Sequence, residues 1–241
     1  MARDLRHFHL RNLGQPRPFQ AKGGGGSKRP SDVPNRAAHA QALLQAIDAL
    51  PDIPAAELPG VYLEVRSRID ERLKKGSLDA SGLTLLRVAE TPDPGGTEER
   101  ATVFATAKGI EKLRKKVEQF RTEDTPDREK DGEFIPGRPK NADLVQSVAA
   151  ITEAGLRALW RSPSGKFPAA DVATVWEVWL EPQMTEGFVA AAPNYGVTVG
   201  ADRLEFPEDI VVIVEADRNQ LAQAVRRLGG VRALAAPTIT A

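Results

Sequence analysis

Residues 210–235 read IVVIVEADRNQLAQAVRRLGGVRALA, and this stretch decides the fold. Its opening run of β-branched residues predicts a strand. Asp217, followed three residues later by Gln220, predicts the capped start of a helix, and Gly229-Gly230 predicts its end. A second strand over residues 231–235 follows at once. The stretch therefore predicts one helix that packs against a sheet and is flanked by two strands of that sheet.

Working outward, the preceding residues complete a recognisable order of elements. The pattern predicts a strand over 175–180, a helix over 184–192 and a strand over 197–206 that bends at Gly200. Strand, helix, strand, strand, helix, strand is the split βαβ, or ferredoxin-like, arrangement. We therefore predict a second split βαβ module over residues 175–236.

A similar order occurs earlier in the chain. Val61, Leu63 and Val65 alternate with polar residues and predict a strand with one buried face. The predicted elements that follow are a short charged helix over 69–75, strands over 83–88 and 101–107 joined by a turn at 92–96, and a helix over 109–123. These elements predict a first split βαβ module over residues 61–123.

The remaining segments connect or precede these modules. Residues 1–35 are rich in Gly and Pro and predict a flexible arm, and residues 36–60 predict a helix capped by Asn35 and then a linker. Residues 124–174 predict a charged loop that orders only on binding, followed by a long helix over 144–159 that Asn141 caps and Pro163 ends. The expected fold is α+β, with two tandem ferredoxin-like modules joined by a long helix.

Composition limits the classes of partner. The chain has 33 basic and 33 acidic residues, so no overall field favours nucleic acid or an anionic membrane. It has no cysteine and no apolar run of membrane-spanning length, and residues 1–10 lack the apolar core of a signal peptide. We expect a cytoplasmic protein whose partners are proteins.

The sequence lacks the residues of a catalytic site. The only histidines, His7, His9 and His39, precede both modules, and no Gly-x-Ser-x-Gly motif is present. Residues 23–28 are Gly-rich but lack the spacing of a phosphate-binding loop. The pairs Glu98-Glu99 and Glu208-Asp209 flank strands at polar turns, where we expect them to be solvated. We predict no enzymatic activity, no cofactor and no metal for this chain alone.

Trp176 and Trp179 are candidate interface anchors. Residues three apart in a strand face opposite sides, so we expect one tryptophan in the core. The other needs cover from the connecting helix or from a partner. An RNA-binding surface is a distant alternative, because the expected central strands carry one Phe and no basic-aromatic motif.

Eight short segments resemble the N-terminal region of a group of large bacterial subtilisin-like serine peptidases. These segments are RAAH at 36–39, VYLE at 61–64, ATVF at 101–104, KKVEQF at 115–120, RPKN at 138–141, LRALW at 156–160, FP at 167–168 and VWEVWL at 175–180. The resemblance spans, with gaps, nearly the whole chain. In that family a catalytic subtilase domain follows, often beside a gene for an AAA-type ATPase. None of the family's catalytic motifs is present here.

The resemblance implies a non-catalytic regulatory module that acts as chaperone, inhibitor or docking domain for a subtilisin-like catalytic domain, in cis or in trans, and an ATPase is a further expected partner. Subtilisin prodomains send a C-terminal tail through the active-site cleft by β-augmentation. The matching candidate is the tail Ala236, Pro237, Thr238, Ile239, Thr240 and Ala241. The alternatives are that this tail is a linker and that the chain is a stand-alone adaptor or split inhibitor.

Overall fold

The first helix, α1 (Arg36–Asp48), begins at the predicted cap. The Asn35 side chain accepts a hydrogen bond of 2.9 Å from the Ala38 amide, which satisfies one of the free N–H groups of the first turn. One side of the helix is buried through Ala40, Leu43, Leu44 and Ile47. This side packs on the first of two sheets.

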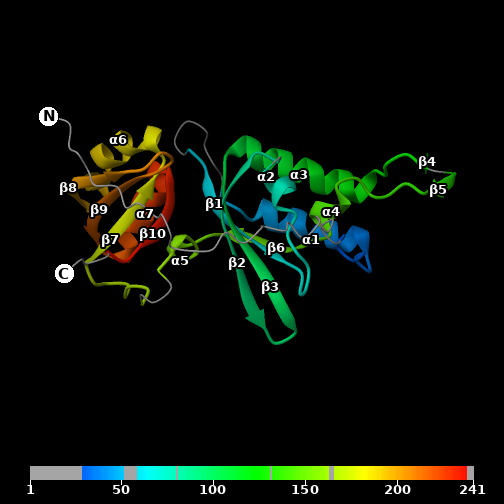
Figure 1. Ribbon diagram of the computed structural model, residues 1–241, viewed down its shortest axis with the longest axis horizontal. Coiled ribbons are helices and arrows are strands. Elements are labelled where there is room, and N and C mark those ends of the chain that lie inside the picture. The colour runs from blue at the N-terminus through cyan, green and yellow to red at the C-terminus, as the bar shows by residue number, and fades with distance from the viewer. Residues whose placement is uncertain (1–28, 52–58, 80, 131, 163–165, 238–241) are drawn as a thin grey trace, which may run out of the picture.

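The computed structural model describes residues 29–51, 59–79, 81–130, 132–162 and 166–237. In these residues the chain is α+β, as predicted, with two four-stranded antiparallel sheets side by side (Figure 1). None of the described helices is long and apolar enough to cross a membrane.

The first sheet has the strand order β2-β3-β1-β6. Its strands are β1 (Val61–Ser67), β2 (Leu83–Asp93), β3 (Gly96–Ala105) and β6 (Val148–Glu153). Helices α1 and α3 (Ala107–Thr122) cover one face, where Leu63, Val103, Leu113 and Phe120 join a single apolar core. Helix α3 thus buries one side, through Leu113, Val117 and Phe120.

The second sheet has the order β10-β7-β9-β8. Its strands are β7 (Thr174–Leu180), β8 (Thr198–Glu205), β9 (Ile210–Ala216) and β10 (Val231–Ala235). One face is covered by α6 (Pro182–Ala191), the 3-10 turn η1 (Ala192–Tyr195) and α7 (Arg218–Leu228), which supply Phe188, Ala192 and Leu221 to a second core.

Both predicted ends of α7 are confirmed. Asp217 and Gln220 form a capping box, in which the Asp217 carboxylate accepts from the Gln220 amide at 2.9 Å and the Gln220 side chain accepts from the Asp217 amide. Gly229 and Gly230 have φ angles of 65° and 71°, a left-handed conformation that favours glycine.

The predicted long connecting helix is wrong. The segment forms two short helices, α4 (Ala142–Val145) and α5 (Leu156–Leu159), with strand β6 between them. Strand β6 pairs with β1, whose edge would otherwise carry unpaired main-chain groups. Asn141 stands at the N-cap position of α4 with a φ of 57°, but its side chain makes no capping hydrogen bond and donates instead to the Lys116 carbonyl. Tertiary pairing has overridden a helical apolar pattern here.

Three other predictions near the first sheet need correction. Residues 69–74 are not helical, and α2 lies later, at Lys75–Asp79. Strands β2 and β3 continue to Asp93 and Gly96, so the hairpin is longer than predicted and projects from the body (Figure 1). The charged loop contains a two-stranded hairpin of β4 (Arg128–Lys130) and β5 (Glu133–Ile135).

Residues 30–32, which the sequence placed in the flexible arm, contact the folded chain. Pro30 is buried, the Ser31 amide donates to the Glu71 carboxylate at 2.9 Å, and Gln146 donates to Asp32 at 2.9 Å. Residues 1–28, together with linker residues 52–58, lie outside the described part of the chain.

Candidate functional site

The side of the second sheet opposite α6 and α7 is the main candidate site. Along β7, Trp176, Val178 and Leu180 face the helices and are fully buried, so Val175, Glu177 and Trp179 face the other way. Strand register places further residues on that side. We call this side the outer face and define it by Val175, Glu177, Trp179, Leu204, Phe206, Val211, Ile213 and Glu215.

Large apolar side chains are exposed on the outer face. Leu204 is 64% exposed, Phe206 47% and Val175 41%. Val172, just before β7, is 56% exposed. Exposed apolar residues that cluster in this way mark an interaction surface more often than isolated ones do.

Trp176 is not an interface anchor. Its side chain is fully buried, and its indole N–H donates to the Ala216 carbonyl at 3.0 Å. Trp160 and Phe167 meet it edge to face at centroid distances of 5.7 and 6.0 Å. Trp176 therefore organises the second core, as the alternation predicted for one of the two tryptophans.

Trp179 lies in the same row of the outer face as Val211 and Leu204. Phe206 stacks on its ring at 5.5 Å with an angle of 9°, and the Arg161 guanidinium lies 5.9 Å from the ring centroid. These two residues give the cover that was expected from a connecting helix. The buried indole N–H of Trp179 has no hydrogen-bond partner among the described residues.

The start of the predicted tail is held beside β10. Trp160 pairs with Leu234 in a parallel bridge, and the Arg161 amide donates to the Leu234 carbonyl at 2.8 Å. The Ala236 amide then donates to the Ser162 hydroxyl at 2.8 Å. The chain's own residues thus cover this edge. Pro237 is the last described residue, and the prediction for Thr238 to Ala241 falls outside the described part.

One of the two carboxylate pairs that were predicted to be solvated is buried. Glu98 and Glu99 are 6% and 3% exposed, which contradicts the prediction for that pair. Glu98 is paired with Arg100 at 2.7 Å, and Glu99 accepts from the Leu73 amide at 2.8 Å. Buried carboxylates need such partners. Because β2 and β3 form a long hairpin, these residues lie within a strand and not at a turn.

One cleft lies where the two sheets meet, and another lies between the first sheet and α5. One, of about 410 Å³, is lined by Val61, Tyr62, Leu156, Leu159 and Val225, with the Arg226–Glu153 ion pair beside it. The other, of about 400 Å³, has charged walls. The buried Tyr62 hydroxyl accepts a hydrogen bond of 2.9 Å from the Val231 amide, and burial raises the pKa of Tyr62 well above its usual value. Tyr62 therefore fastens the first sheet to the second.

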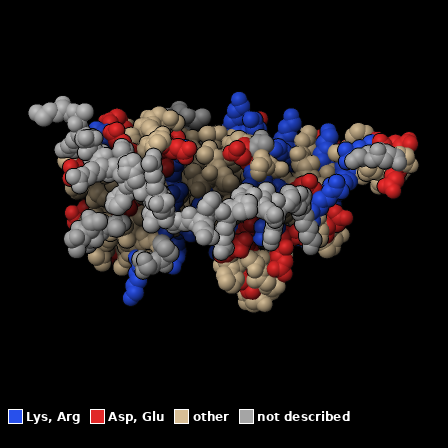
Figure 2. All heavy atoms as spheres, in the orientation of Figure 1, with Lys and Arg blue, Asp and Glu red and all other residues tan. Residues whose placement is uncertain are grey.

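A third cleft, of about 300 Å³, contains the Lys116 amine. This amine donates to the Ser81 hydroxyl at 2.8 Å, and burial, followed by the charge of Lys112, lowers the pKa of Lys116. Exposed basic side chains lie along α3 (Figure 2). Polar groups of this cleft form hydrogen bonds with neighbouring protein groups, so these groups do not need a ligand as a partner.

The described part of the chain contains no arrangement of side chains that is typical of a catalytic site. His39 is the one histidine within it, and its ring bonds to the Val145 carbonyl at 2.9 Å. The described residues contain no group of three His, Asp or Glu side chains that could hold a metal ion. His7 and His9 lie outside the described residues.

No protein-family model matches the chain, and no curated protein matches it. Among solved structures, the chain is similar to an unknown protein from Galdieria sulphuraria. The match has 9% identity and a TM-score of 0.22, and it covers 70% of this chain and 89% of that one. A match of this quality carries no argument about fold or function.

Proposed function

We propose that this chain is the non-catalytic N-terminal regulatory module of a subtilisin-like serine peptidase. In this role it binds the catalytic domain, in cis or in trans, as chaperone, inhibitor or docking domain. The observation that carries the proposal is the apolar outer face of the second sheet, which lies next to the strand that leads into the C-terminal tail. The resemblance of the eight sequence segments supplies the family.

The strand orders support a tandem ferredoxin-like arrangement. In each sheet, numbered by appearance, the order is 4-1-3-2 with antiparallel neighbours, which suits two split βαβ units. In the first unit β6 takes the place of the fourth strand. Subtilisin prodomains are also split βαβ modules that lay a sheet against the protease.

The edge of β10 indicates how the tail would engage a partner. Because residues 160–162 cover that edge, a partner strand has little access to β10 itself. We therefore assign pairing with a partner's sheet to the tail residues that follow Ala236. An extended segment in an active-site cleft uses this mode of β-augmentation.

The first experiment measures inhibition of the cognate catalytic domain by wild-type chain and by Leu204→Glu. A charge on the outer face should weaken inhibition by at least roughly tenfold, the equivalent of about 1.4 kcal/mol. Phe134→Glu is the matched control, because Phe134 is 70% exposed but lies on β5, far from the outer face (Figure 1). If the wild-type chain neither binds nor inhibits the catalytic domain, the proposal is wrong.

The stand-alone adaptor remains a second candidate because of Phe134. The β4–β5 hairpin projects from the end of the molecule opposite the second sheet and exposes this aromatic ring (Figure 1). Two separated apolar sites suit a protein that bridges two partners, such as a peptidase and an AAA-type ATPase. Removing residues 237–241 separates the two functions: capture of a partner by an adaptor should survive the deletion, and inhibition through a cleft should not.

RNA binding receives less support than either candidate. The aromatic pair on the outer face, Trp179 and Phe206, is accompanied by Glu177 and Glu215, whose charges repel phosphates. The cytoplasmic location stays part of the proposal, based on the composition.

A further inference from the structure

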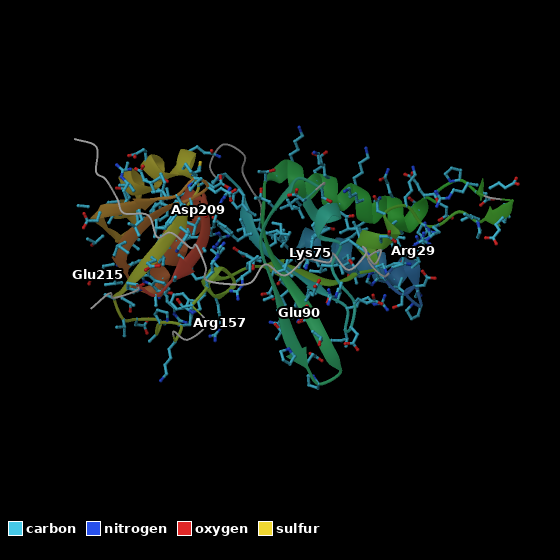
Figure 3. The ribbon with its side chains drawn as sticks, viewed as in Figure 1. Arg29, Lys75, Glu90, Arg157, Asp209 and Glu215 are labelled. Carbon is cyan, nitrogen blue, oxygen red and sulfur yellow. The ribbon has the colours of Figure 1, made fainter. Side chains whose placement is uncertain are left out.

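Strand β8 lies at the open edge of the second sheet. The strand order gives it one neighbour, β9, and no other described strand pairs with it. Seven of its eight residues are exposed. The opposite edge strand, β10, is the one that joins the first sheet through the hydrogen bond from Val231 to Tyr62. In Figure 3, Asp209 and Glu215 lie at the two ends of β9, in the half of the molecule away from Glu90 on β2.

The main-chain groups of Arg203 and Glu205 point out of this edge. The Phe206 amide donates to the Asp209 carbonyl at 2.8 Å, so these two residues form a hydrogen-bonded pair of the β8–β9 hairpin. Hydrogen-bonded positions alternate along an antiparallel strand. The main chain of Leu204 therefore also faces β9, and that of Arg203 and Glu205 faces the open edge. Unpaired N–H and C=O groups of this kind are a template for another strand.

The exposed edge is self-complementary about Leu204. A register shift just before Arg203 restricts regular pairing to the residues from Arg203 onward. With a two-fold axis at Leu204, Arg203 of each copy faces Glu205 of the other, so opposite charges meet twice. An axis at Arg203 or at Glu205 would instead place like charges opposite each other. An axis at Phe206 would need an N–H group from Pro207, which has none.

We propose that β8 pairs antiparallel with β8 of a second copy, about a two-fold axis at Leu204, so that the two second sheets join in one continuous sheet. Arg203 and Glu205 of the two copies exchange main-chain hydrogen bonds, and their side chains form ion pairs. The Arg203 guanidinium keeps its contact with Glu186 at 2.6 Å, because it has donors for two carboxylates. An isologous interface of this kind is closed at two copies.

The pairing also covers apolar side chains of the outer face. Leu204 is exposed in the single chain and meets Leu204 of the second copy, because a non-hydrogen-bonded pair brings side chains close together. Phe206, which is also exposed, lies diagonally across from Leu204 of the second copy. One short pair of strands is a small interface, so we expect a dissociation constant of about 10–100 μM.

A cysteine at the proposed axis tests the pairing directly. The chain has no cysteine, and the Cα atoms of a non-hydrogen-bonded pair are about 4.5 Å apart, within the range of a disulfide. In a buffer of reduced and oxidised glutathione, Leu204→Cys should therefore form a covalent dimer of about twice 26.1 kDa.

Val175→Cys is the matched control for this crosslink. Val175 is exposed on the same face, but it lies on β7, so its two copies would be about 24 Å apart in the dimer. This variant should remain a single chain in the same buffer. Equal crosslinking of the two variants, or none of Leu204→Cys, would overturn the proposal.

Sedimentation equilibrium without introduced cysteines tests the charge pairing. The mass of the wild-type chain should rise from one copy toward two between about 5 and 500 μM. Glu205→Arg places arginines opposite each other in both pairs and should raise the dissociation constant about tenfold. Adding Arg203→Glu to this variant exchanges the two charges and should restore the dimer. Both residues are exposed, so the substitutions should leave the fold intact.

Glu129→Arg is the control for net charge, because Glu129 is exposed on β4, at the other end of the molecule (Figure 1). It should leave the dissociation constant unchanged. A wild-type mass of one copy at all concentrations would contradict the dimer and leave this edge to a strand of a different protein. Failure of the charge exchange to restore the dimer would contradict the register.

The dimer goes beyond the proposed docking role, although Leu204 belongs to both surfaces. If the catalytic domain docks on the outer face, it competes with the second copy for this side chain, and that consequence rests on the proposed function. These measurements contain no peptidase, so their failure leaves the proposed docking untouched. A failure to bind the peptidase likewise leaves the dimer untouched.

Discussion

Tyr62 shows how one side chain can join two sheets. Its neighbours on β1 enter the first core, whereas the Tyr62 ring packs in the second core. The centroid of this ring lies 5.0 Å from that of Phe104. Its hydroxyl satisfies the amide of Val231, at the start of β10. The alternation in the sequence predicted that Tyr62 leaves the first core, but a contact with a residue 169 positions away has no local signal.

Removing the Tyr62 hydroxyl should therefore destabilise the fold more than the loss of a single atom suggests. We expect Tyr62→Phe to lower the free energy of unfolding by about 1–3 kcal/mol, because the buried Val231 amide loses its acceptor. Urea denaturation measures this. Tyr195→Phe is the matched control and should change stability much less, since no hydrogen bond of the Tyr195 hydroxyl is found in the described residues. Equal effects of the two substitutions would contradict this role of Tyr62.

The raised pKa of Tyr62 predicts a loss of stability in alkali. The folded chain keeps this phenol protonated above the usual pKa of 10.0, whereas the unfolded chain releases the proton. The contribution of Tyr62 to the free energy of unfolding is thus fully present below pH 10 and declines as the pH rises further. Subtracting the 295 nm titration of Tyr62→Phe from that of wild type should show Tyr62 ionising well above pH 10. Ionisation below pH 10 in the folded chain would be the contrary result.

At the scale of elements, glycines decide how α7 passes into β10. A side chain at Gly230 would meet the Met184 Cβ at 2.5 Å, and the φ of 71° is itself unfavourable for other residues. We expect Gly230→Ala to lower the free energy of unfolding by about 1–3 kcal/mol. Thermal unfolding with a circular dichroism signal measures the change.

Gly187 supplies the control for that substitution. It lies in α6, is exposed, and has no atom within 4 Å of the position that a Cβ would take. Gly187→Ala should therefore stabilise the chain by roughly 0.5–1 kcal/mol through helix propensity. If both alanines destabilised the chain equally, backbone conformation would not be the cause at Gly230.

Elements with both ends encoded locally were predicted well, and an element defined by its neighbour was not. Helix α7 has its capping box and its terminal glycines in sequence, and the structure places it at Arg218–Leu228. Strand β6 has Val148 and Ile151 at a spacing that suits a helix. It became a strand because the free edge of β1 offers main-chain partners, and the paired residues of that edge are 81 or more positions away.

For the whole molecule, the shared packing around Tyr62 and Phe104 predicts a single unfolding transition. All three tryptophans lie in the second half of the chain, at 160, 176 and 179, whereas far-ultraviolet circular dichroism reports on both sheets. The two signals should give the same urea midpoint in wild type. Phe104→Ala, which removes contacts between the sheets, should separate the midpoints.

A substitution within one core serves as the reference for that comparison. Leu63 is fully buried in the first core, so Leu63→Ala should lower the stability by about 2–5 kcal/mol and shift both signals together. If the two signals already differ in wild type, the sheets unfold independently and the junction has little cooperative effect.

The sequence by itself determined the α+β class, the capped helices α1 and α7, and the alternation that buries Trp176. It also excluded the familiar catalytic motifs. These properties depend on residues within a few positions of one another, where spacing and capping act directly. Only the tertiary structure decided that β6 is a strand, that Glu98 and Glu99 are buried, and that Phe206 and Arg161 cover Trp179. Each of these depends on which distant segment lies alongside, and local sequence does not encode that choice.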